Sequence, residues 1–204
     1  LDAQAVSHGE IKFPASGHFS NFVRRRDNDP SGRITFLAGV RKLGVPYTFS
    51  LLFFKAEAGF STQLFLPDSV GNGAITIPTI LEVNDSTLFV FGRKAAYKVR
   101  VHANNSFSIL WQTTLSIPGG VCKAAVQVND DFVLFSAAGD IIGVNSAGLQ
   151  VFTKSELFSF YSAVTLPDGI VTCGENPAHK AVVVKMTYTG DVIWSKEFAD
   201  QKYN

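Results

Sequence analysis

Four histidines are the first residues to weigh for chemistry, and they are His8, His18, His102 and His179. No two lie close together in sequence, and none stands in a His-x-x-x-His or Cys-x-x-Cys context that would bind a transition metal. The sequence has neither a Gly-x-Ser-x-Gly nucleophile elbow nor a glycine-rich phosphate loop. We therefore predict that the chain is not an enzyme, and we assign no catalytic, cofactor-binding, metal-binding or other ligand-binding residue.

The best single motif is the segment 27–35, which reads Asp-Asn-Asp-Pro-Ser-Gly-Arg-Ile-Thr. Oxygen ligands at alternate positions followed by a glycine are how a loop wraps Ca²⁺. Here Ser31 replaces the third acid, and Thr35 stands where a further carboxylate is expected. The other interpretation is an Asp-Pro-Ser-Gly turn between two strands. We predict no tightly bound calcium, because the charge that sets the affinity is about halved.

The charge distribution excludes several classes of partner. The net charge is +1, with 17% charged and 46% hydrophobic residues, so we expect neither a nucleic-acid partner nor attraction to anionic membranes. Arg24, Arg25 and Arg26 would alternate between the two faces of a strand, which favours a solvated edge over a phosphate site. The longest apolar run, residues 49–54, is far too short to span a bilayer, so we expect no membrane insertion.

A repeated unit must position all of these residues. Four copies of a turn followed by a strand with a large aromatic residue are anchored at Phe65, Trp111, Phe152 and Trp194, with spacings of 46, 41 and 42 residues. A period of about 40–50 residues built from short strands is typical of a β-propeller blade. The sequence therefore predicts an all-β propeller of about four four-stranded antiparallel blades. The predicted blades, all in one propeller domain, are residues 19–66, 79–115, 123–158 and 161–198.

The segments within each predicted blade support four strands. Turn residues rich in Asn, Asp, Pro and Gly, such as Asn84-Asp85 and Asn129-Asp130, precede runs of β-branched and aromatic residues. A third strand follows in each copy, at residues 47–55, 96–103, 140–145 and 180–187. The described pattern predicts negligible helix.

The N-terminal segment 1–18 has two interpretations. Residues 9–13 align with 190–194, which favours a partial blade made of third and fourth strands, with the chain forming part of a larger propeller. The alternative is an N-terminal arm that docks elsewhere. A partial blade would leave an open strand edge that needs a partner.

The cysteines and aromatic residues have structural interpretations. Cys122 and Cys173 fall at the same end of neighbouring predicted blades, so a disulfide and two separate thiols both remain open. We predict that Trp111, Phe152 and Trp194 occupy equivalent positions and are largely buried between blades, because strand aromatics of a propeller mostly pack there. Core packing is also the expectation for Phe49, Phe53, Phe54, Phe60, Phe65, Phe89 and Phe91.

The segment 181–194, with its motif Thr189-Gly190-x-x-x-Trp194, resembles the quinoprotein-type propeller repeats of bacterial and phage proteins. The calcium-like loop 27–35 is similar to the Asp-rich loops of integrin-type propellers. Quinone-dependent dehydrogenases of the first type would imply eight blades, adjacent cysteines and calcium-binding carboxylates, and the last two features are missing here. The resemblance therefore implies the non-catalytic members, which serve as assembly scaffolds.

Three functions follow from this sequence. The first is a non-enzymatic propeller scaffold that contacts other protein subunits of a larger extracellular or viral assembly, such as a phage tail or virion component. The second is a glycan-binding propeller, with a surface glycan as its ligand. The third is a fragment of a propeller enzyme whose active site uses other blades. Exposed aromatic residues would favour the second, and clustered carboxylates or histidines the third.

Overall fold

The computed structural model describes residues 17–25, 35–42, 48–55, 59–67, 79–84, 86–91, 95–102, 107–117 and 122–198. Of residues 17–79 it describes the backbone alone. Strands, turns and bends make up these segments, and none of them contains a helix long and apolar enough to cross a membrane. The predicted calcium-like loop and the predicted partial blade lie outside the described residues, apart from Thr35, Gly17 and His18, which belong to strands.

In the part of the chain that the structure describes, sixteen strands form four antiparallel sheets of four strands each, and we call these sheets blades 1 to 4. Blade 1 holds β1 Gly17–Arg25, β2 Thr35–Lys42, β3 Thr48–Lys55 and β4 Gly59–Pro67. Blade 2 holds β5 Thr79–Asn84, β6 Thr87–Phe91, β7 Ala95–Val101 and β8 Phe107–Thr114. Blade 3 holds β9 Cys122–Val128, β10 Asp131–Ser136, β11 Asp140–Val144 and β12 Gln150–Ser155. Blade 4 holds β13 Ser159–Leu166, β14 Gly169–Glu175, β15 Ala181–Met186 and β16 Val192–Glu197.

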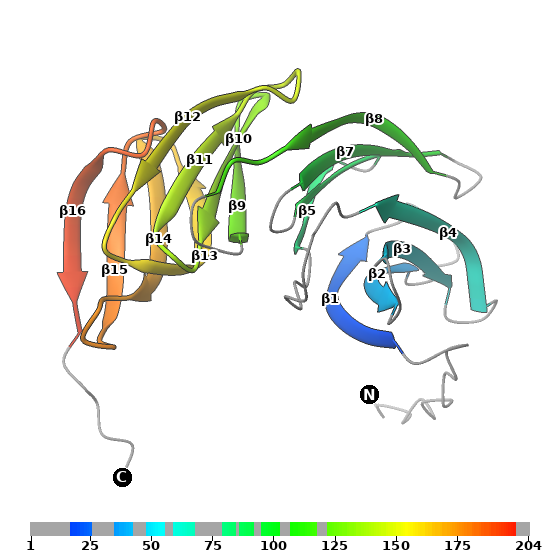
Figure 1. Cartoon of the computed structure of the whole chain (residues 1–204), viewed down its shortest axis with the longest axis horizontal. Coiled ribbons are helices and arrows are strands. Elements are labelled where there is room, and N and C mark those ends of the chain that lie inside the picture. The colour runs from blue at the N-terminus through cyan, green and yellow to red at the C-terminus, as the bar shows by residue number, and fades with distance from the viewer. Residues whose placement is uncertain are drawn as a thin grey trace, which may run out of the picture.

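The blades follow one another in chain order around an open arc, with blade 1 and blade 4 at its two ends (Figure 1). The first strands of the blades lie along the inside of the arc, where β5 contacts β1 and β9, and β9 packs against β13. This arrangement confirms the prediction of an all-β propeller with four-stranded antiparallel blades.

A bulge in the fourth strand of every blade fixes which residues are equivalent. Pairing between the third and fourth strands shifts directly before Lys98↔Trp111, Gly143↔Phe152 and Lys185↔Trp194. Trp111, Phe152 and Trp194 therefore hold equivalent positions, as predicted. In blade 1 the same shift precedes Phe53↔Thr62, so the prediction of Phe65 as the fourth anchor was wrong. Thr62 takes that position, because the bulge rather than the aromatic residue defines the repeat.

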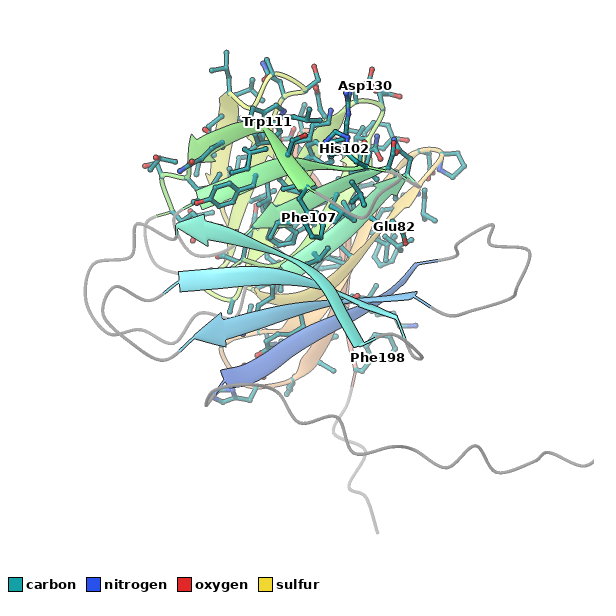
Figure 2. The ribbon with its side chains drawn as sticks, turned by 90° about the vertical axis from the view of Figure 1, so that its right-hand side faces the viewer. Glu82, His102, Phe107, Trp111, Asp130 and Phe198 are labelled. Atoms are coloured by element: carbon teal, nitrogen blue, oxygen red, sulfur yellow. The ribbon has the colours of Figure 1, made fainter. Side chains whose placement is uncertain are left out.

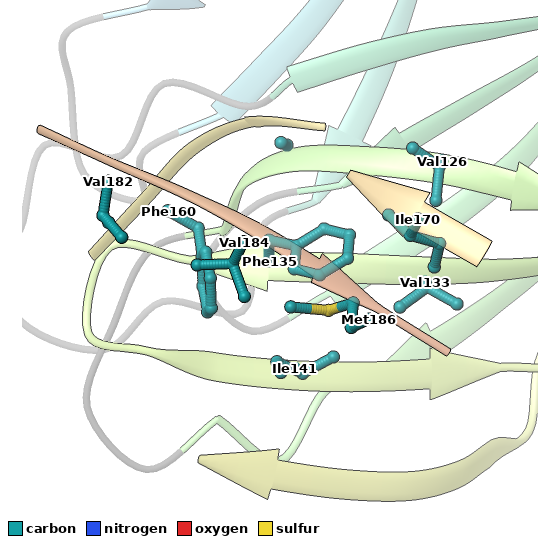
Figure 3. Close-up of a cluster of buried hydrophobic side chains, with 10 residues drawn as sticks. Val126, Val133, Phe135, Ile141, Phe160, Ile170, Val182, Val184 and Met186 are labelled. Carbon is teal, nitrogen blue, oxygen red and sulfur yellow. The ribbon is translucent and has the colours of Figure 1, made fainter. Parts of the chain in front are cut away.

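The hydrophobic core lies between neighbouring blades. We call the face of a blade toward the next blade its trailing face, and the face toward the previous blade its leading face. One buried cluster joins the trailing face of blade 3 to the leading face of blade 4 (Figure 3). Its largest members from blade 3 are Phe135 and Ile141, and from blade 4 Phe160 and Met186.

A second cluster joins blade 2 to blade 3 in the same way. Phe89 and Phe91 of blade 2 pack with Phe132 and Leu134 of blade 3. The rings of Phe89 and Phe132 stack in parallel, with centroids 4.0 Å apart. The predicted core role is thus confirmed for Phe89 and Phe91, whereas the side chains of Phe49, Phe53, Phe54, Phe60 and Phe65 lie outside the described set.

Candidate interaction surface

Among the described residues, the side chains that the sequence offered for chemistry do not form a shared site. His102 is half-buried and its Nε2 atom lies 2.9 Å from the Ser108 hydroxyl on blade 2, the blade that also carries Trp111 (Figure 2). His179 is exposed, 3.5 Å from a Glu175 carboxylate oxygen. Among the described residues no three His, Cys, Asp or Glu side chains gather as a metal site would require.

The two cysteines do not meet. Cys122 is buried at the start of β9, and Cys173 is exposed on β14, so both are free thiols. Burial raises the pKa of the Cys122 thiol to about 12, with a smaller contribution from the Asp140 carboxylate. Of the two interpretations left open by the sequence, separate thiols is therefore the one observed.

Buried polar groups stabilise the turns between second and third strands. In blade 3 the Ser136 hydroxyl donates to Asp140 Oδ2 at 2.9 Å and accepts the backbone N–H of Asp140 at 2.8 Å. The Ser155 hydroxyl donates to the other carboxylate oxygen of Asp140 at 3.1 Å. In blade 4, Asn176 Oδ1 accepts the backbone N–H groups of Ala178 and Lys180, both at 3.0 Å. These carboxylate and amide groups are satisfied within their own blades, so they act as structural residues.

The junction between blades 2 and 3 shows how an aromatic residue of a fourth strand packs against the next blade. The Trp111 indole Nε1–H donates to the carbonyl oxygen of Ser146 at 2.9 Å. Gly148, in the same turn between β11 and β12, lies under the indole with a positive φ of 84°. A Cβ atom there would lie 2.8 Å from the ring, so only glycine allows this close approach. The β11–β12 turn of blade 3 thus packs against Trp111 of blade 2.

The junction between blades 3 and 4 uses the equivalent turn. Gly190, with a φ of 81°, lies against Ile141 and Lys154 of blade 3. The Lys154 ammonium forms an exposed ion pair with Asp191, the next residue of that turn. The hydrogen bond from Lys154, followed by one from the Thr189 hydroxyl, holds the pKa of Asp191 below its ordinary value. The Thr189-Gly190 part of the sequence motif therefore lies at the junction between blades 3 and 4.

The trailing face of blade 4 is the surface that no described residue covers. Ser162, Lys185 and Lys196 share this face with its apolar residues, which are Val164, Val171, Cys173, Val183 and Trp194. By strand register they are equivalent to Val126, Val133, Phe135, Ile141 and Phe152 of blade 3. The first four of those blade 3 residues are buried in the cluster shared with blade 4, and Phe152 packs against it.

Exposure is the property in which the two trailing faces differ. Val126 is 4% exposed and Phe135 is fully buried, whereas Val164 is 54% exposed and Cys173 is exposed. Trp194 is 44% exposed, so the prediction that it is largely buried between blades was wrong. Trp111 and Phe152, in contrast, are half-buried at junctions. Trp111 is less exposed because it packs on the β11–β12 turn of the next blade, whereas no described turn contacts Trp194 in this way.

Sequence reasoning missed this surface, although part of its signal was present. The strand β16 is exposed along its whole length and carries Ile193 beside Trp194, with Phe198 directly after it. A strand with apolar residues on both of its faces is typical of a sheet covered on both sides. That pattern identifies a buried strand, but only the arc shows which face lacks its cover.

Comparison with known proteins supports the fold. No model of a known protein family matches the chain, and no curated protein is similar to it in sequence. A protein of unknown function from Bacteroides caccae is 14% identical, with a TM-score of 0.57, over 92% of this chain and 70% of that one. BamB from Moraxella catarrhalis is 15% identical, with a TM-score of 0.52, over 84% of this chain. Sqt1 from Saccharomyces cerevisiae is 11% identical, with a TM-score of 0.52, over 80% of this chain.

The chain spans 61% of the BamB chain and 59% of the Sqt1 chain. Likeness at these identities shows the fold, which is that of a β-propeller. At the level of the fold, this likeness bears out the expected resemblance to β-propeller repeat proteins.

Proposed function

We propose that this chain is a non-enzymatic β-propeller scaffold that makes protein–protein contacts within a larger assembly. The observation that carries the proposal is the trailing face of blade 4, where Val164, Cys173 and Trp194 are exposed among the described residues, whereas their equivalents on blade 3 are buried or half-buried against a neighbouring sheet. An apolar surface of this kind is a typical protein-interaction site. The setting that we propose is an extracellular or virion assembly, in keeping with a chain of only 17% charged residues.

A glycan-binding propeller is the second candidate, and a specific observation favours it. Trp194 is 44% exposed, and Tyr161 and Tyr188 are exposed on the same blade. Exposed aromatic rings can stack on apolar ligand faces. Protein contact is the better proposal, because the equivalent Trp111 packs on a backbone turn of another blade through a hydrogen bond and a glycine.

Site-specific photo-cross-linking tests the two candidates. A benzophenone amino acid at position 164 should cross-link to a protein in extracts of the source cells, and the added substitution Trp194→Asp should abolish this product. The same group at Leu157, which is exposed on the loop between β12 and β13, is the matched control and should give none of that product. Equal labelling from both positions would contradict the proposal. Binding to a glycan panel that Trp194→Ala abolishes would replace it with the second candidate.

A further inference from the structure

We propose that Asn84 is an acceptor site for an asparagine-linked glycan. The sequence Asn84-Asp85-Ser86 fits the acceptor pattern Asn-x-Ser/Thr, in which x is any residue except proline. The inference goes beyond the proposed function and shares with it only the extracellular setting, because glycans of this type are found on secreted proteins.

The β5–β6 hairpin places Asn84 and Ser86 at the surface of blade 2. Asn84 is the last residue of β5 and pairs with Thr87, the first residue of β6, so Ser86 lies in the turn between them. Both Asn84 and Ser86 are exposed. Blade 2 has a described blade on each side (Figure 1), and the hairpin stays exposed with both neighbours in place. A glycan at this position would therefore extend into solvent.

Two hydrogen bonds arrange the acceptor amide within the hairpin. The backbone N–H of Ser86 donates to Asn84 Oδ1 at 3.0 Å, and the Ser86 hydroxyl donates to the same oxygen at 3.1 Å. The first bond forms an Asx-turn, in which an asparagine side chain bonds the backbone two residues further on. Both bonds engage the amide oxygen, so neither occupies the Nδ2 atom to which a sugar would be attached.

Strand β7 holds the other side of the same turn. The carbonyl oxygen of Ser86 accepts the backbone N–H of Val101, the last residue of β7, at 2.8 Å. Ser86 is therefore bonded both to the sheet and to the Asn84 side chain, which keeps its hydroxyl within reach of the amide.

The reaction joins the Asn84 amide to the sugar of a lipid-linked oligosaccharide diphosphate, with an oligosaccharyl transferase as the catalyst. A bond forms between Nδ2 and the anomeric carbon of the sugar, while the bond between that carbon and the diphosphate oxygen breaks. The lipid diphosphate leaves with the electron pair of the broken bond, and one proton of Nδ2 passes to a base of the transferase. Hydrogen-bond donors at Oδ1 stabilise the negative charge that develops on this oxygen as the proton leaves.

The other asparagines with described side chains each lack part of this arrangement. Asn145 Oδ1 also accepts the backbone N–H two residues on, at 3.1 Å, but that residue is Ala147, which has no hydroxyl. Asn129 is exposed in the corresponding hairpin of blade 3, and an aspartate stands two positions after it. Asn176 is buried and precedes a proline. Among these residues, Asn84 alone combines exposure, the Asx-turn and the neighbouring hydroxyl.

The test expresses the chain behind a cleavable secretion leader in cultured eukaryotic cells and locates glycans by peptide mass spectrometry. Residues 104–106 read Asn-Asn-Ser and form a second acceptor pattern outside the described residues, so the test uses the Asn104→Gln background. We expect a glycan on Asn84 in most of the secreted molecules. Release of that glycan by an enzyme that hydrolyses the amide bond should leave an aspartate at position 84.

Two pairs of variants make the test specific to this hairpin. Ser86→Ala should lose the glycan and Ser86→Thr should keep it, because the acceptor pattern needs a hydroxyl at this position. Asn84→Gln should lose the glycan, and Asn129→Gln, at the exposed asparagine of the corresponding hairpin in blade 3, should keep it.

An unmodified Asn84 in the secreted chain would overturn the proposal, as would a glycan on Asn84 that persists in Ser86→Ala. Neither result bears on the proposed scaffold function, since the cross-link from position 164 is measured on blade 4. The two proposals can therefore fail separately.

Discussion

Replacing Gly148 by alanine tests whether the packing of Trp111 on the next blade requires a glycine in the β11–β12 turn. Gly148 has a φ of 84°, and an added Cβ would lie 2.8 Å from two atoms of the Trp111 ring system. The indole would have to move, and its movement would break the 2.9 Å hydrogen bond to the Ser146 carbonyl oxygen. Gly190 is the matched control, since its φ is 81° and its added Cβ would come closest to the Ile141 side chain, at 3.0 Å, with the Lys154 side chain at 3.6 Å.

The magnitudes separate the two variants. A left-handed backbone costs an alanine about 1–2 kcal/mol, and both variants share this cost. Gly148→Ala should lose in addition about 0.5–1.5 kcal/mol for the indole hydrogen bond, together with part of the ring packing. We therefore expect Gly148→Ala to lower the free energy of unfolding by about 2–4 kcal/mol, and Gly190→Ala by about 1–2 kcal/mol.

Urea unfolding monitored by circular dichroism measures both free energies. The decisive comparison repeats Gly148→Ala in a Trp111→Ala background, where its cost should fall to that of Gly190→Ala because no ring remains to be displaced. Equal costs for the two glycine variants would refute the reasoning, as would a Gly148→Ala cost that does not depend on Trp111.

Three other predictions concern buried polar groups. Thr172→Val should raise the free energy of unfolding by about 1 kcal/mol in urea titrations, because the buried Thr172 hydroxyl has no hydrogen-bond partner; a loss of stability would show that the hydroxyl is satisfied. Ser136→Ala should lower it by about 2–3 kcal/mol, since it leaves the buried Asp140 carboxylate without one donor, whereas an effect below about 0.5 kcal/mol would show that the turn does not depend on this hydroxyl. Cys122 has its pKa raised from 9.0 to about 12, so its contribution to stability is complete below pH 9.0 and is lost as the pH rises toward 12. At about pH 10.5 the wild type should lose about 2 kcal/mol more than Cys122→Ala, relative to neutral pH, and equal losses would contradict the assignment.

The strand pattern of the fold could be predicted from the sequence because its signals are local. Turn residues such as Asn129, which has a φ of 55°, stand where the chain reverses, and β-branched runs stand between them. The exact repeat could not be read in blade 1, where Thr62 rather than Phe65 follows the bulge. A bulge is a property of strand pairing, and pairing is absent from a single strand's composition.

The candidate surface was harder to predict because it depends on neighbours. Trp111 and Trp194 stand in the same register and in similar local sequences, and only the presence of a following glycine turn separates a half-buried indole from an exposed one. Cys173 gave no sign of its role either, since its equivalence to the buried Phe135 appears only once β14 is paired with β15.

Because the two clusters described above each join two adjacent sheets, neighbouring blades share their hydrophobic core. A single blade taken out of the arc would expose both of its faces to water. Its stability therefore depends on the blades beside it, as in other repeat proteins. During synthesis each blade would leave the ribosome with its leading face already matched by the blade before it and its trailing face waiting for the next. The growing chain therefore exposes the trailing face of its most recently made blade until the next blade folds against it.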